Sequence, residues 1–171
     1  MKPKLSDITA WYQAEALMQP ALIRAIDNIR RALEESDWEG KYEEEWRWPE
    51  DTTEEMKARI KLLEQQLKEA EKVGDMPRVD EIQGALDALP QPQPLYTFHL
   101  QKGDRRAMID LWQVCYRICF KDYAARAALS AGDRVAVEVD TTLLGDDGDV
   151  DWQRLDTKAK GEVDAFFKRL P

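Results

Sequence analysis

The chain has 171 residues and a formal net charge of −9 at pH 7, and 43% of its residues are hydrophobic. This length allows one domain with a sizeable core, and the apolar content excludes a disordered chain. The acidic balance excludes general nucleic-acid binding, because such binding needs a dominant basic face that releases counterions from phosphates.

The sequence predicts a cytoplasmic protein without membrane insertion. It begins without the apolar run of a signal peptide, and no segment approaches the roughly 18 apolar residues that a membrane span needs. Two cysteines in a chain of this length do not form a disulfide framework, which fits a reducing compartment.

Helical periodicity predicts two helices near the start of the chain. Ser6 or Asp7 can cap a first helix that ends near Met18, and Pro20 suits the first position of a second helix. Apolar residues recur at helical spacing as far as Leu33. We expect these two helices to pack together.

An antiparallel helical hairpin is predicted in residues 52–89. Its first helix runs from about Thr53 to Val73. Thr52 and Glu55 have capping-box spacing at its start, and Gly74 lies just beyond its end. The hairpin has too few residues to bury its own apolar seams. We therefore expect it to dock on the rest of the domain or on another copy of the chain, which would make a homo-oligomer.

The remaining elements complete an α+β fold. Four predicted strands form a small, mainly antiparallel sheet: Lys41 to Trp48, Leu95 to Gln101, Arg105 to Ile109 and Arg134 to Asp140. Gly103 can take a positive φ in the turn between the middle two. A helix from Asp110 to about Leu129 and a final helix after an acidic loop pack on the sheet. The prediction is a single domain, residues 1–171, with the hairpin 52–89 inserted.

The two cysteines, Cys115 and Cys119, lie on the apolar face of a predicted helix, so we expect them to fill the core. A structural zinc site needs four ligands, and His99 is the only histidine in the chain. A nucleophilic cysteine needs a pKa lowered by a base or a helix N-terminus, and both cysteines lie inside the helix. We predict no catalytic, cofactor-binding or metal-ligating residue, and no cofactor.

The acidic loop after the last strand has the spacing that begins an EF-hand: Asp147, Asp149 and Asp151. The match then fails, because Trp152 and Lys158 hold the glycine and glutamate positions of that motif. Capping of the final helix by Asp149 or Asp151 explains these residues better. A carboxylate or divalent-metal-dependent enzyme that uses residues 140–151 is the alternative function.

The strongest functional signal is the acidic-aromatic segment, Trp38 to Pro49, because tryptophan, tyrosine and arginine dominate binding hot spots. The predicted partner-binding residues are the anchors Tyr42, Trp46 and Trp48, with Glu43 and Glu45 steering a basic partner from the opposite strand face. The alternative is that the aromatic side chains belong to the core. The prediction is a macromolecular binding module, an adaptor or assembly factor without catalytic activity, whose partner is another protein.

The run Q-A-E-A-L-M-Q-P-A-L-I-R-A-I-D-N-I-R at residues 13–30, with W-E-G-K-Y at residues 38–42, resembles a small soluble family of unknown function found in cyanobacteria. The resemblance covers the first quarter of the chain and contains no catalytic signature. It implies a cytoplasmic or thylakoid-adjacent housekeeping role and transfers no functional residue.

Overall fold

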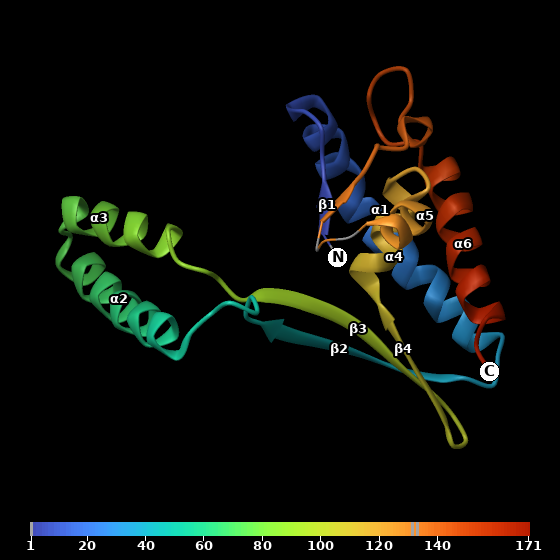
Figure 1. Ribbon diagram of the computed structural model, residues 1–171, viewed down its shortest axis with the longest axis horizontal. Helices are drawn as coiled ribbons and strands as arrows, with labels where there is room; N and C mark the ends of the chain where they lie inside the picture. The colour runs from blue at the N-terminus through green and yellow to red at the C-terminus, as the bar shows by residue number, and fades with distance from the viewer. Residues whose placement is uncertain (1, 131, 133) are drawn as a thin grey trace. The chain divides into compact units, whose positions relative to one another are not determined.

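The computed structural model describes residues 2–130, 132 and 134–171 and has the α+β fold predicted from the sequence (Figure 1). Its helices are α1 (Ile8–Glu34), α2 (Glu54–Val73), α3 (Met76–Asp87), α4 (Leu111–Cys119), α5 (Tyr123–Leu129) and α6 (Trp152–Lys168). Its strands are β1 (Lys2–Lys4), β2 (Glu39–Arg47), β3 (Gln93–Lys102), β4 (Arg105–Asp110) and β5 (Arg134–Ala136). None of the described helices has both the length and the apolar character that crossing a membrane requires.

The residues form two compact units. The first unit comprises Met1–Glu44 and Tyr96–Pro171, and the second unit comprises Glu45–Leu95. Each unit has its own hydrophobic cluster of buried side chains.

Helix α1 is one continuous helix where the sequence predicts two. Asp7 caps it by accepting a hydrogen bond from the backbone N–H of Ala10 at 2.7 Å. Pro20 lies inside the helix, although an interior proline removes a backbone hydrogen bond and costs about 3 kcal/mol. Fully buried side chains step by four residues through this point: Leu17, Ala21, Ala25 and Ile29. Their burial on both sides of Pro20 outweighs the cost, so the predicted division near Met18 is wrong.

The core of the first unit is built around α1, α4 and α6. Helix α1 contacts both α6 and α4, and Figure 1 shows α1 (blue) beside α6 (red). Helix α6 contributes the buried residues Leu155, Ala159 and Val163. Asn28 of α1 is also buried, and its amide donates to the Arg24 carbonyl at 2.8 Å and to Asp156 at 3.2 Å. The buried amide is therefore hydrogen-bonded, as burial of a polar group requires.

A three-stranded sheet in the order β2-β3-β4 contains the predicted β-hairpin. Strands β3 and β4 pair antiparallel, with Phe98 opposite Ile109. Gly103 in the turn has a φ of 59°, which confirms the expected left-handed conformation. Strand β2 lies at one edge of this sheet, and eight of its nine residues are exposed.

The predicted fourth strand, Arg134 to Asp140, does not join this sheet. Strand β5 pairs in parallel with β1, with Val135 opposite Pro3, and Val139 forms an isolated bridge with Phe120. The three alternating valines of the segment are nevertheless buried: Val135, Val137 and Val139. Alternation therefore predicted the buried face of this segment correctly but not its strand partner.

The single helix predicted after Asp110 is divided into α4 and α5. Asp110 caps α4, as expected. Helix α4 ends because the segment after β5 takes up backbone groups there: the N–H of Lys121 donates to the Glu138 carbonyl and the N–H of Asp140 donates to the Cys119 carbonyl, each at 2.8 Å. Backbone groups paired with this segment cannot also continue the helical ladder.

In the second unit, α2 and α3 contact each other and share a cluster of buried residues: Ile60, Ala70, Ile82 and Leu86. Gly74 ends α2 with a φ of 73°, as its position predicted. The N-cap is Thr53, one residue after the predicted Thr52, and its hydroxyl accepts a hydrogen bond from the N–H of Met56 at 3.2 Å. The hydroxyl of Thr52 is buried without a hydrogen-bond partner among the residues that the structure describes.

These contacts predict different effects for two neighbouring threonines. Thr53→Ala should lower the free energy of unfolding of the second unit by about 1 kcal/mol, because it removes the cap of α2. Thr52→Ala, the matched control, should change it by less than about 0.5 kcal/mol. Native-state hydrogen exchange of the α2 amides measures both. A larger loss for Thr52→Ala would place the cap at Thr52.

Candidate functional site

Cys115 and Cys119 are fully buried in α4, which confirms the predicted burial. Burial raises the pKa of Cys119 to about 12, and it raises the pKa of Cys115 as well. The thiolate is the form that attacks electrophiles, so burial disfavours nucleophilic chemistry at both positions. The two side chains pack in the core of the first unit.

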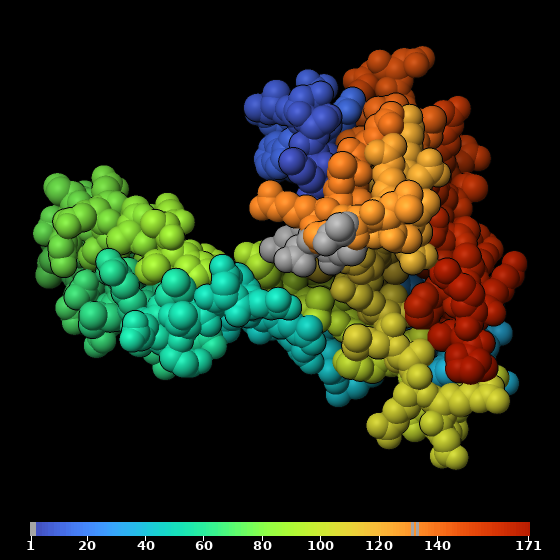
Figure 2. All heavy atoms as spheres, viewed as in Figure 1, coloured from blue at the N-terminus to red at the C-terminus, as the bar shows by residue number. Residues whose placement is uncertain are grey.

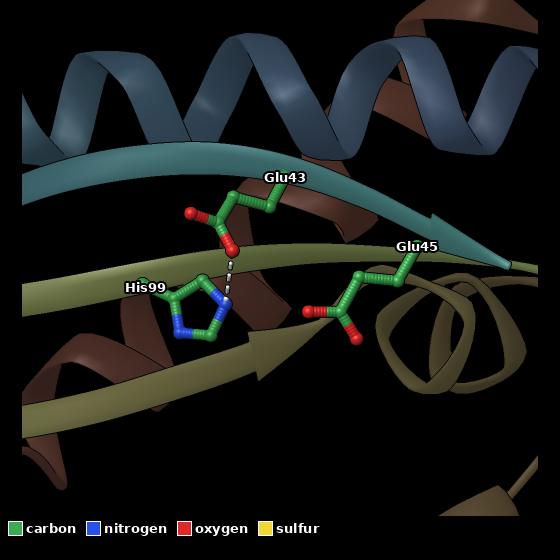
Figure 3. A group of neighbouring side chains, drawn as sticks. All are labelled: Glu43, Glu45 and His99. Carbon is green, nitrogen blue, oxygen red and sulfur yellow. Dashed lines mark ion pairs between the residues drawn. The ribbon is translucent and has the colours of Figure 1, made fainter. Parts of the chain in front are cut away.

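His99 lies on β3 at the exposed face of the sheet, where its Nε2 is 3.1 Å from Glu43 Oε2 (Figure 3). Glu43 also lies 3.0 Å from the Lys41 ammonium, and the hydrogen bond from Lys41 lowers the pKa of the Glu43 carboxyl. Within the first unit, His99 and Glu43 offer two ligands, fewer than the four of a structural zinc site. Glu45, also drawn in Figure 3, belongs to the second unit.

The acidic-aromatic segment is divided between core and surface. Trp38 is buried, whereas Trp46 is 63% exposed and Tyr42 is 41% exposed. Trp48 is half-buried: it packs against the cluster of the second unit, and the Lys57 ammonium lies 5.7 Å from its ring centre. Of the three predicted anchors, Trp46 and Tyr42 therefore present the most aromatic surface to solvent, and Trp48 is partly covered by the second unit.

The two predicted steering acids already have cationic neighbours. Glu43 pairs with Lys41, and Glu45 lies 3.7 Å from Arg47. Glu44 lies between them on the strand face of Trp46 and has no ion pair or hydrogen bond with any described residue. Sequence alternation placed Glu44 on the aromatic face but gave no sign that Glu43 and Glu45 would have cationic neighbours while Glu44 has none among the described residues.

Asp140 begins the acidic loop and is held by Lys158 and Thr142. Lys158 Nζ lies 2.6 Å from Asp140 Oδ2, and the hydroxyl and N–H of Thr142 donate to Oδ1 at 2.5 and 3.2 Å. Burial alone would raise the pKa of Asp140, but the hydrogen bonds from Lys158 and Thr142 outweigh it, so the pKa lies below its usual value. The Asp140 carboxylate therefore stabilises the fold through its contacts with Lys158 and Thr142.

The rest of the acidic loop is closed by its own hydrogen bonds. Gly145 donates to the Asp149 carbonyl at 2.7 Å, and Asp147 accepts from the N–H of Asp149 at 3.1 Å. Asp151 caps α6 by accepting from the N–H of Arg154 at 3.1 Å, which confirms the capping interpretation. Asp140 lines two pockets, one of which also contains Asp151, and Asp146, Asp147 and Asp149 line neither of these two.

The first unit also has an open groove of about 610 Å³ that sequence reasoning missed. Its lining residues are Pro3, Leu5, Trp11, Ala14, Glu15, Met18, Gln19, Leu22, Tyr96, Trp112, Tyr116 and Phe120. They come from α1, α4, β3 and the segments at β1 and after α4, which lie far apart in the sequence. A pocket of this size lined mainly by apolar and aromatic side chains is typical of a ligand-binding site.

Comparison of the chain with family models, curated proteins and solved structures finds no match. The resemblance to the cyanobacterial family therefore stays a prediction.

The burial of the two thiols predicts that they react slowly with thiol reagents. In the native protein at neutral pH, Cys115 and Cys119 should react with a thiol reagent at least about a hundredfold more slowly than free cysteine, because burial excludes the reagent and suppresses the thiolate. In denaturant both should react at the free rate. Rapid labelling of either cysteine in the folded protein would show that α4 exposes it.

The pair formed by Asp140 and Lys158 predicts a pH-dependent contribution to stability. Asp140→Asn should lower the free energy of unfolding by about 1 to 3 kcal/mol at neutral pH, and Asp146→Asn, an exposed control, should change it little. Because the folded-state pKa of Asp140 is lowered, its contribution is complete above the unfolded pKa of about 4 and is lost as pH falls through the folded value. Denaturant unfolding across this range should show the wild type and Asp140→Asn converging; a constant difference would contradict the assignment.

Proposed function

We propose that this chain is a protein-binding module, an adaptor or assembly factor, that recognises a basic partner through the acidic-aromatic segment. The observation that carries the proposal is the 63% exposure of Trp46 on a strand that also carries Glu44 and Glu45. Burial of apolar surface is what lets a tryptophan stabilise a fold, so this indole contributes little to folding. Tryptophan and tyrosine are enriched among the few residues that dominate binding energies.

The position of β2 at a sheet edge supports the proposal. An edge strand presents backbone N–H and C=O groups with which a partner strand can pair. Tyr42 is already held against the sheet, with its ring centre 5.5 Å from that of Phe98 and 6.3 Å from that of Tyr96. A side chain ordered before binding loses less conformational entropy when the partner arrives.

Charge supports a basic protein as the partner. From Asp37 to Glu55 there are nine acidic residues and only two basic ones, Lys41 and Arg47. Such a surface attracts oppositely charged partners and speeds association, and the net charge of −9 disfavours nucleic acid. A cytoplasmic location is part of the proposal, and the two free thiols, which a reducing compartment preserves, support it.

The test compares two exposed tryptophans in binding to a partner isolated from native lysate on the immobilised chain. Trp46→Ala should weaken binding about 30-fold or more, equivalent to about 2 kcal/mol, and leave stability nearly unchanged. Trp152→Ala, a control at 49% exposure on α6, should leave the affinity unchanged. Calorimetry gives the affinities and denaturant unfolding gives the stabilities.

Two results would contradict the proposal. One is unchanged affinity in a folded Trp46→Ala variant, which would remove the segment from the interface. The other is a stability loss of about 3 to 5 kcal/mol for Trp46→Ala, which would assign Trp46 to the core.

A further inference from the structure

The groove of the first unit has one wall formed by a single face of α1. The wall residues follow helical spacing from Trp11 to Leu22, and the aromatic residues opposite come from β3 and the α4 region. The first turns of α1, blue in Figure 2, lie at the surface, and Trp11 is 50% exposed. The groove is therefore open to a ligand from solvent.

The facing wall is a continuous row of aromatic rings. Ring centres are 5.5 Å apart for Tyr96 and Trp112, 6.5 Å for Trp112 and Tyr116, and 6.0 Å for Tyr116 and Phe120. Burial raises the pKa of Tyr116 to about 12, so its phenol is neutral at physiological pH. The faces of such rings carry partial negative charge and attract cations.

Among the described residues that line the groove, Glu15 is the only one with a charged side chain. It is exposed and has no ion pair or hydrogen bond with any residue that the structure describes. The residues three and four positions away on α1, where a helical ion pair would form, are Trp11, Tyr12, Met18 and Gln19, none of which is basic. The described lining of the groove therefore combines aromatic rings with one uncompensated carboxylate and includes no cationic side chain.

We propose that this groove binds a small organic cation with an apolar body, such as an alkyl- or arylammonium compound. The alkyl or aryl part would contact the apolar walls, including Met18 and Leu22, and the ammonium group would lie near Glu15 and the aromatic rings. Both the charge of the lining and the aromatic composition favour this ligand over a fatty acid, whose carboxylate would be repelled by Glu15. The inference does not depend on the proposed protein-binding function, because the groove and β2 share no lining residue.

The test titrates the full chain with three probes that share one alkyl chain: octyltrimethylammonium, octanol and octanoate. Tryptophan fluorescence and calorimetry should show octyltrimethylammonium binding at least about tenfold more tightly than the other two. Glu15→Gln should reduce that preference to near equality, and Trp11→Ala should weaken the binding of octyltrimethylammonium. Controls matched in chemistry, Glu34→Gln on the same helix and Trp152→Ala on α6, should bind like the wild type.

Several outcomes would overturn the proposal. Equal affinity for the three probes would make the groove an apolar surface without charge selection. Absence of binding, or binding unaffected by both Glu15→Gln and Trp11→Ala, would remove the groove as a cation site. A wild-type dimer in light scattering that Trp11→Ala dissociates would identify a second copy of the chain as the occupant.

Discussion

The first unit depends on one packing interaction, the burial of a stripe of α1 formed by Leu17, Ala21, Ala25 and Ile29. This stripe faces the core that α4 and α6 complete, and it keeps α1 continuous through Pro20. Continuity also shapes the groove, because the groove wall from Trp11 to Leu22 crosses Pro20. Two separate helices would not present those side chains as one surface.

Local sequence signals predicted what local physical chemistry decides. The cap at Asp110, the cap at Asp151 and the turn at Gly103 each depend on residues within a few positions of one another. Burial of Cys115 and Cys119 followed from helical periodicity for the same reason. The sequence left open whether Trp46 is exposed or belongs to the core, because alternation assigns residues to strand faces but does not say which face is covered.

What the sequence did not predict involves partners distant in the chain. Pairing of β1 with β5 could not be read from Lys2–Lys4, a segment too short to show alternation. The end of α4 depends on backbone bonds to Glu138 and Asp140, which no helical signal near Cys119 reveals. The groove was missed because its walls meet only after folding. The predicted helix boundary near Pro20 was wrong because packing specific to this core outweighs the general cost of a proline inside a helix.

The central functional claim is that the edge strand β2 meets a protein partner, and the hydrogen-exchange footprint of the bound partner tests it most directly. Binding should slow the exchange of backbone amides within β2, because a partner that covers Trp46 or pairs with the strand shields them from solvent. Amides of the acidic loop at residues 145–149 should exchange at the same rate with and without the partner. Protection of that loop, with the exchange of β2 unchanged, would contradict the account.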